Sequence, residues 1–185
     1  MNERSRRCFL QLISAAASVP LASSARRAAR AAAVAPTVKL TYRGRAASGA
    51  LAFQYAVNNP GNASVYLVGG NRMPYITVVA PDKIELHFDV IDTPAEPYMF
   101  PLVDVTPLAA GATRTQSLRI AYPVVPSDHF HLSAKGVPTK LPLSVQAFQG
   151  YSDKPFVSTK DSKIYREFLS WQQNASSPAI VIPHF

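Results

Sequence analysis

Hydrophobic and polar positions alternate in short runs from Thr37 onward, and turn-forming residues separate these runs. In Val38–Tyr42 and Leu51–Val57 every second residue is large and apolar, which places those side chains on one face of an extended strand. The stretch Asn-Asn-Pro-Gly-Asn separates the second run from Ser64–Val68, and its Asn and Gly residues accept a positive φ. The pattern predicts an all-β fold of short strands.

Two further runs, Tyr75–Ala80 and Lys83–Ile91, are separated only by Pro81 and Asp82. A break this short between two β-rich runs predicts a hairpin. In the second run apolar residues alternate with Lys83, Glu85, His87 and Asp89. This alternation predicts one strand face on a core and the other face in water.

The rest of the chain supplies more strands and one exception. The further apolar runs are Val103–Leu108, Gln116–Val125, Pro138–Gly150 and Ile180–Ile182, and a proline-rich stretch, Asp92–Pro101, predicts a loop. Together the pattern predicts a sandwich of seven or eight strands. Between Asp161 and Gln173 the apolar residues recur at helical spacing after a capping-box-like start, which predicts one short C-terminal helix, with an irregular strand as the alternative.

Two stretches carry a resemblance to a known architecture. Residues 107–118 read Pro-Leu-Ala-Ala-Gly-Ala-Thr-Arg-Thr-Gln-Ser-Leu and residues 54–67 read Gln-Tyr-Ala-Val-Asn-Asn-Pro-Gly-Asn-Ala-Ser-Val-Tyr-Leu. The first resembles the turn before a middle strand of bacterial immunoglobulin-like domains, and the second resembles their second strand, turn and third strand. The resemblance implies an immunoglobulin-like β-sandwich, and it bears on architecture and not on activity.

The first 33 residues follow a different pattern. An Ala- and Ser-rich apolar run from Phe9 to Ala25 is shorter and less apolar than the roughly 20 residues of a spanning helix. The residues just before and at its start resemble the signal of the bacterial twin-arginine translocation system at five positions: Ser5, Arg6, Arg7, Phe9 and Leu10. The resemblance implies export by the twin-arginine translocase, with no stable membrane span in the mature protein.

The apolar run is followed by the basic residues Arg26, Arg27 and Arg30. Basic residues at this position would hinder ordinary secretion, so they favour the twin-arginine interpretation. Small residues at Ala31 and Ala33 form a cleavage site before Val34, and cleavage before Arg26 is a second candidate. A chance basic tail or an amphipathic targeting peptide are the alternatives. We expect a signal peptide at 1–33, a single domain at 34–185, and a periplasmic or secreted mature protein.

Removing the leader changes the charge balance. The full chain has 19 basic and 11 acidic residues, and the leader holds six arginines and one glutamate, so the mature chain has 19 − 6 = 13 against 11 − 1 = 10, or +3. The basic residues are scattered singly, which argues against a nucleic-acid-binding protein. The single cysteine, Cys8, also lies in the leader. We therefore expect no disulfide, thiolate nucleophile or cysteine-ligated metal in the mature protein.

The candidate chemistry is limited to one histidine pair. His129 and His131 would project to the same face of a strand and could share a metal ion, although the surrounding Pro-Ser-Asp-His-Phe-His favours a solvated polar loop. Glycine-loop, nucleophile-elbow and zinc-protease motifs do not occur in the sequence. We expect no cofactor and no enzymatic activity.

The pattern as a whole predicts a small exported domain that acts by binding an unknown envelope protein or ligand, through an edge strand or the Asp92–Pro101 loop. Such domains resemble accessory and inhibitor-like immunoglobulin-fold modules of bacteria, including the intracellular proteinase inhibitor type. A periplasmic metal-binding protein that uses His129 and His131 is the alternative function.

Overall fold

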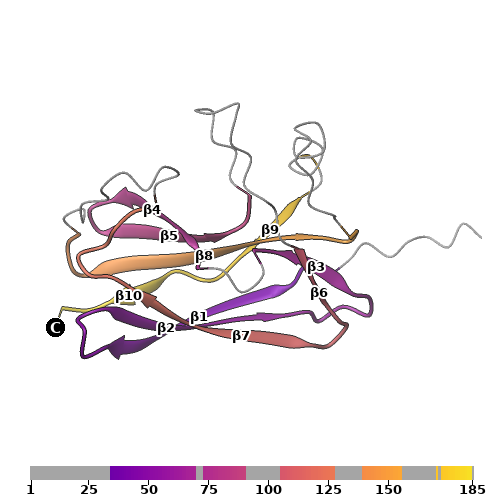
Figure 1. Ribbon diagram of the computed structural model, residues 1–185, viewed down its shortest axis with the longest axis horizontal. Coiled ribbons are helices and arrows are strands. Elements are labelled where there is room, and N and C mark those ends of the chain that lie inside the picture. The colour runs from indigo at the N-terminus through magenta and orange to yellow at the C-terminus, as the bar shows by residue number, and fades with distance from the viewer. Residues whose placement is uncertain are drawn as a thin grey trace, which may run out of the picture. The chain divides into compact units, whose positions relative to one another are not determined.

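The computed structural model describes residues 34–69, 73–90, 105–127, 139–155, 170 and 172–184. Residues 32–185 group into one compact unit (Figure 1). The elements formed by the described residues are all strands: β1 (Thr37–Arg45), β2 (Leu51–Asn58), β3 (Val65–Val68), β4 (Tyr75–Ala80), β5 (Lys83–Phe88), β6 (Val105–Leu108), β7 (Thr113–Ile120), β8 (Leu143–Ser152), β9 (Gln173–Ser176) and β10 (Ile180–Ile182). The predicted all-β class is confirmed.

Sheet A contains β1, β2 and β7 in that order, and all its pairings are antiparallel. Its strands alternate buried with exposed or half-buried positions, as the sequence predicts; in β2, Leu51, Phe53, Tyr55 and Val57 are the buried residues. The turn between β1 and β2 closes with a hydrogen bond from the Gly49 amide to the Ala46 carbonyl at 2.8 Å, and Gly49 has a φ of 81°. Glycine suits this position because a Cβ disfavours positive φ.

Sheet B is organised around β8. Along one edge of β8, β5 pairs in parallel with residues 144–149 and β3 pairs in antiparallel fashion with Tyr151 and Ser152. Along the opposite edge, β10 pairs with residues 143–145 and β9 with residues 148–151. Strands β4 and β6 extend the sheet beyond β5 and β3. A single ten-residue strand therefore holds four partners.

The core lies between the two sheets, which pack in a sandwich-like arrangement (Figure 1). Apolar side chains from both sheets form one buried cluster, and nearly all of them come from the alternating positions of the strands. Its largest fully buried members are Tyr55, Phe53, Leu51, Leu67, Ile84, Leu86, Leu118, Ile120, Leu143 and Ile182. Burial of this apolar surface, at roughly 25 cal/mol per Å², is the main favourable contribution to folding.

One buried asparagine joins two turns. The side-chain amide of Asn59 donates hydrogen bonds to the carbonyls of Ala63, Leu108 and Ala109 at 2.8, 3.1 and 3.1 Å, and its Oδ1 accepts one from the Gly61 amide. Its backbone bonds to Ala112 and Gly111. The Asn-rich turn after β2 and the turn before β7 are thus held by the same residue. These turns lie in the two stretches, residues 54–67 and 107–118, on which the predicted resemblance to immunoglobulin-like domains rests.

The observed strands agree with the sequence predictions in some places and differ in others. The hairpin around Pro81 and Asp82 is confirmed as β4 and β5. The strand predicted over Gln116–Val125 instead runs from Thr113 to Ile120, and ends shortly before Pro123, which has no amide hydrogen for a ladder. The structure has more strands than the seven or eight predicted, partly because the polar β9 pairs with β8.

The predicted C-terminal helix over Asp161–Gln173 lies mostly outside the described residues. At its end the prediction is wrong, because Gln173 pairs with Tyr151 and begins β9. No helix is among the elements that the described residues form. The Asp92–Pro101 loop also lies outside the described residues.

Candidate functional site

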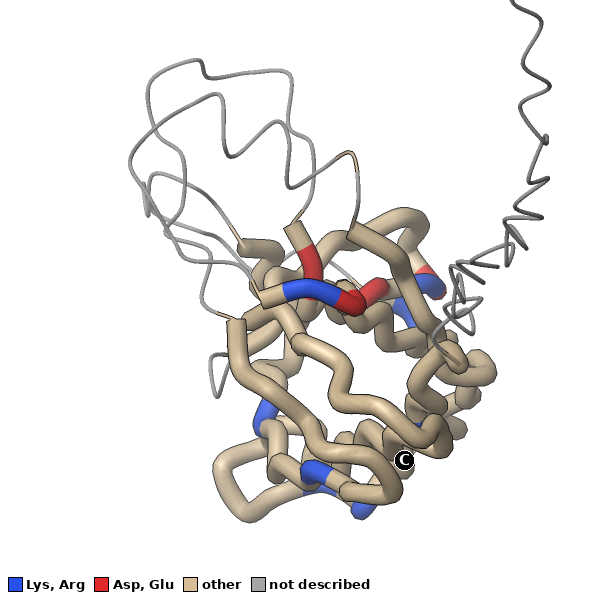
Figure 2. Tube along the Cα trace, turned by 90° about the vertical axis from the view of Figure 1, so that its right-hand side faces the viewer, with Lys and Arg blue, Asp and Glu red and all other residues tan. Residues whose placement is uncertain are grey.

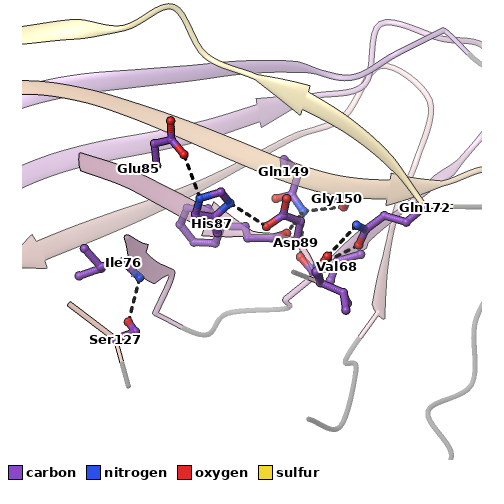
Figure 3. A network of polar contacts seen from close by, with 11 residues as sticks. Val68, Ile76, Glu85, His87, Asp89, Ser127, Gln149, Gly150 and Gln172 are labelled. Carbon is purple, nitrogen blue, oxygen red and sulfur yellow. Dashed lines mark hydrogen bonds and ion pairs between the residues drawn. The ribbon is translucent and has the colours of Figure 1, made fainter. Parts of the chain in front are cut away.

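The site residues named by the sequence lie outside the described part of the chain. These are the translocation residues Ser5, Arg6, Arg7, Phe9 and Leu10, the cleavage residues Ala31 and Ala33, and the histidines His129 and His131. Their proposed roles stay predictions. Two further polar clusters of the described residues lie in sheet B (Figure 3).

The first cluster is a histidine of β5 that lies between two carboxylates, Glu85 of the same strand and Asp89, which follows the strand. His87 Nδ1 lies 3.2 Å from Asp89 Oδ1, and His87 Nε2 lies 3.4 Å from Glu85 Oε2. Alternation along the strand puts the three side chains on the same face (Figure 3). Lys83 joins the cluster through a 3.0 Å ion pair with Glu85. Both ring nitrogens of His87 therefore face negative charge.

This face is less exposed than the sequence predicts. The side chains of His87 and Asp89 are only 14% and 6% exposed. The reason is the position of β5, which lies between β4 and β8 and not at an edge. The ring of His87 stacks on Phe148 of β8 with 5.0 Å between the ring centroids.

Burial and the neighbouring carboxylates have opposite effects on the pKa of His87. Burial by itself would lower its pKa, because it disfavours the charged imidazolium. The hydrogen bond and charge of Asp89, together with the charge and hydrogen bond of Glu85, outweigh burial and raise the pKa above its usual value. A protonated His87 then donates to two carboxylates, so both its nitrogens are occupied by structural bonds.

The second cluster centres on Gln149, which is fully buried on the inner face of β8. Its side-chain amide donates hydrogen bonds to the carbonyls of Val68, Phe88 and Gly150 at 2.8, 3.0 and 2.7 Å. Its Oε1 accepts a 2.8 Å hydrogen bond from the hydroxyl of Tyr55, which belongs to sheet A. The Gln149 side chain therefore joins the end of β3, the end of β5 and the opposite sheet.

Tyr55 is held by packing as well as by this hydrogen bond. Its ring stacks on Phe88 with centroids 4.2 Å apart. Burial raises its pKa far above the usual range, with a smaller opposing effect from Arg114. The hydroxyl therefore stays protonated at physiological pH and donates its hydrogen bond to Gln149.

The side-chain amide of Gln172 bonds to the backbone beside these two clusters. Gln172 accepts a hydrogen bond from the Val90 amide at 2.9 Å and donates one to the Val90 carbonyl at 3.1 Å (Figure 3). This reproduces with a side chain the paired bonds of a β-ladder. Close by, a Cβ on Gly150 would lie 2.6 Å from Gln172 Oε1 and 2.9 Å from the Cβ of Asp89. Glycine at position 150 thus permits the close approach of the two clusters.

The side chains of these clusters are engaged in internal hydrogen bonds and ion pairs. Their polar groups bond to one another or to backbone ends, and within the described part of the chain no three histidine, cysteine, aspartate or glutamate residues are arranged to hold a metal ion. Sequence reasoning missed Gln149 and Gln172, since a lone glutamine carries no motif. The signal available for Gln149 was a polar residue in phase with Leu143, Val145 and Ala147.

Comparison with known proteins adds no family to this description. No family model matches the chain, and no curated protein or solved structure matches it. Among the described residues, no helix combines the length and the apolar character needed to cross a membrane.

We predict that the Tyr55–Gln149 hydrogen bond stabilises the fold. Tyr55→Phe should lower the free energy of unfolding by about 1–3 kcal/mol, because it leaves the buried Gln149 Oε1 without a donor. In a Gln149→Leu background, the same replacement should cost clearly less, since that acceptor is gone. Urea denaturation of the two single variants and the double variant measures the coupling. Tyr66→Phe, at a half-exposed tyrosine of β3, is the control. Equal costs in both backgrounds would show that the bond contributes nothing.

We predict that the contribution of His87 to stability depends on pH. Its pKa is raised on folding, so the stabilisation is complete below the unfolded pKa of about 6.5 and is lost as pH rises through the higher folded value. The difference in free energy of unfolding between wild type and His87→Gln should therefore shrink from pH 5 to pH 9. The matched control is the same replacement at His184, an exposed histidine outside this cluster. A His87→Gln difference that is constant with pH would contradict the electrostatic assignment.

Proposed function

We propose that this protein is an exported, immunoglobulin-like β-sandwich that acts by binding, as a non-enzymatic accessory module of the bacterial envelope. The observation that carries the binding role is a polar surface, the outer face of sheet A. It comprises the residues that alternate with the buried positions of β1, β2 and β7: Thr37, Lys39, Thr41, Ala52, Gln54, Ala56, Asn58, Thr113, Thr115, Ser117 and Arg119.

The rigidity of this face favours recognition of a ligand. Strand β2 pairs with β7 without a break and with β1 except at the Arg43 bulge, and the inner face of the sheet is anchored in the core. The backbone of paired strands is already ordered and loses little freedom on binding, which lowers the cost of association. The polar clusters of sheet B, in contrast, are occupied by internal bonds.

The strand order supports the immunoglobulin-like part of the proposal. The first, second and seventh strands share one sheet, while β8 pairs with both β3 and the last strand, β10. This corresponds to the separation of strands A, B and E from strands C, F and G in immunoglobulin folds. The β4–β5 hairpin and the parallel pairing of β5 with β8 are departures from that arrangement.

The exported part of the proposal rests on the leader. Its paired arginines precede an apolar run that ends before basic residues and a small-residue cleavage site. Export through the twin-arginine translocase would deliver a folded domain to the periplasm or beyond.

We expect the leader to direct export. In a bacterial host with a twin-arginine translocase, the full chain should yield a periplasmic form whose mass begins near Val34. Replacement of both motif arginines, Arg6→Lys with Arg7→Lys, should leave the uncleaved precursor in the cytoplasm. The matched control, Arg26→Lys with Arg27→Lys, changes two arginines outside the motif and should still be exported. Equal export of both double variants would refute the assignment.

We expect the exported protein to bind a component of the envelope. The protein recovered from the periplasm should be retained on at least one of three immobilised envelope fractions, namely outer membrane, peptidoglycan or soluble polysaccharide. Heat-denatured protein is the control for nonspecific adsorption. Failure to be retained on any of the fractions would overturn the proposed function.

A further inference from the structure

The charges of the domain are divided between its sheets. Strands β1, β2 and β7 contain five basic residues, Lys39, Arg43, Arg45, Arg114 and Arg119, and none of the ten acidic residues that follow residue 33. The acidic residues that the structure describes, Asp82, Glu85, Asp89 and Asp153, lie in or next to strands of sheet B. In Figure 2 the basic and acidic residues occur together on one side of the domain, and only basic ones on the other.

Three of these cations belong to the outer face of sheet A or reach it. Lys39 and Arg119 are exposed members of the face, and within the described residues neither forms an ion pair. Arg43, which is the extra residue of a bulge in β1, donates to Gln54 on the same face. By strand geometry Lys39 and Arg43 are about 13 Å apart along β1. Arg119 lies two strand spacings, about 10 Å, from the Arg43–Gly44 bulge and about 16 Å from Lys39.

Between the cations the face offers hydroxyl, amide and methyl groups. The pairing register aligns Thr41, Gln54 and Ser117 in one row across the strands, and Lys39, Ala56 and Thr115 in the next. None of the residues of the outer face is aromatic or a large aliphatic. The large hydrophobic residues that are exposed in the described part of the chain, Val34, Met73, Val79 and Val181, lie outside β1, β2 and β7.

This composition narrows the class of ligand. A lipid surface is anchored by apolar and aromatic side chains that enter it, and the centre of a protein interface is enriched in aromatic residues. The outer face has neither. A sugar polymer that carries carboxylate or sulfate groups fits it, because arginine forks pair with such anions and hydroxyl and amide groups bond to sugar hydroxyls.

We propose that the outer face of sheet A binds an acidic polysaccharide, with Lys39, Arg43 and Arg119 pairing with its anionic groups and Thr41, Gln54, Thr115 and Ser117 bonding to its hydroxyls. This inference rests on the proposed binding function and names its ligand class. The charged contacts supply attraction that salt screens. The hydroxyl rows supply the part of the affinity that depends on sugar geometry.

The test measures affinity of the recovered protein for polygalacturonate, with neutral dextran as the uncharged comparison. Binding to polygalacturonate should be at least tenfold tighter than to dextran and should weaken about tenfold between 0.05 and 0.5 M salt. Lys39→Gln with Arg119→Gln should weaken it about tenfold or more. The matched control, Lys140→Gln with Lys154→Gln, removes the same charge from exposed sites outside sheet A and should change it less than about twofold.

A second variant separates recognition from simple charge attraction. Thr115→Val with Ser117→Ala leaves the charge unchanged and should weaken binding about threefold to tenfold, as expected for the loss of hydrogen bonds. Equal losses in the two charge variants, or no loss in the hydroxyl variant, would overturn the inference. So would equal affinity for polyglutamate or for vesicles that contain phosphatidylglycerol.

The two levels of the proposal fail in different ways. If the protein is retained on an envelope fraction and Lys39→Gln with Arg119→Gln is retained equally, the polysaccharide inference is wrong and the binding function stands. If no fraction retains the wild-type protein, both are wrong. Thermal unfolding of each variant should match wild type, because the replaced side chains are exposed or half-exposed.

Discussion

Strand β8 imposes the constraint on which the rest of the sandwich depends. Two strands of opposite direction, β5 and β3, must end against each other along one of its edges. Where strands end, backbone carbonyls lose their ladder partners, and a buried carbonyl without a partner is costly. The Gln149 amide lies at that junction and satisfies the carbonyls of Val68 and Phe88. The parallel pairing of β5 and the antiparallel pairing of β3 can therefore lie next to each other on β8 without leaving these buried carbonyls unpaired.

The same side chain ties this junction to the other sheet. Through the hydroxyl of Tyr55, the polar groups of sheet B connect to β2 of sheet A across an otherwise apolar layer. A fully satisfied polar contact in a core specifies how the layers meet, whereas apolar contacts alone tolerate sliding. The registry between the two sheets is therefore fixed by chemistry as well as by shape. This framework also fixes the positions of the outward-facing residues on which the proposed binding function depends.

The local pattern of the sequence predicted most of the strands, and its failures have identifiable causes. Alternation located β1, β2 and β5 because each has one face on the core, and the short break at Pro81 and Asp82 located β4 as the partner of β5. It missed β9, whose Gln-Asn-Ala-Ser is extended because β8 offers a free edge and not because of its own residues. Helical spacing before it led to the wrong assignment of Gln173.

The polar clusters were beyond a sequence pattern for a different reason. The predicted solvent face of β5 is covered because β8, some sixty residues later in the chain, pairs beside it and places Phe148 on His87. The bonds of Gln149 likewise join residues 61, 81 and 94 positions away. The residues next to Gln149 and His87 in the sequence give no indication of such distant partners. In contrast, the leader and the His129–His131 pair are linear motifs, and they remain predictions.

Asn59 places an unusual restriction on two surface turns. Turns between strands commonly accept extra residues, because their backbone faces water and little depends on their length. Here one buried amide spans both turns, with partners at Ala63 on one side and Leu108 and Ala109 on the other. An added residue in either turn would move carbonyls away from Asn59 and leave a buried donor unsatisfied. We expect this end of the sandwich to keep a constant loop length in divergent sequences, so an insertion site for a tag or reporter is better sought at the Ala46–Ala50 turn.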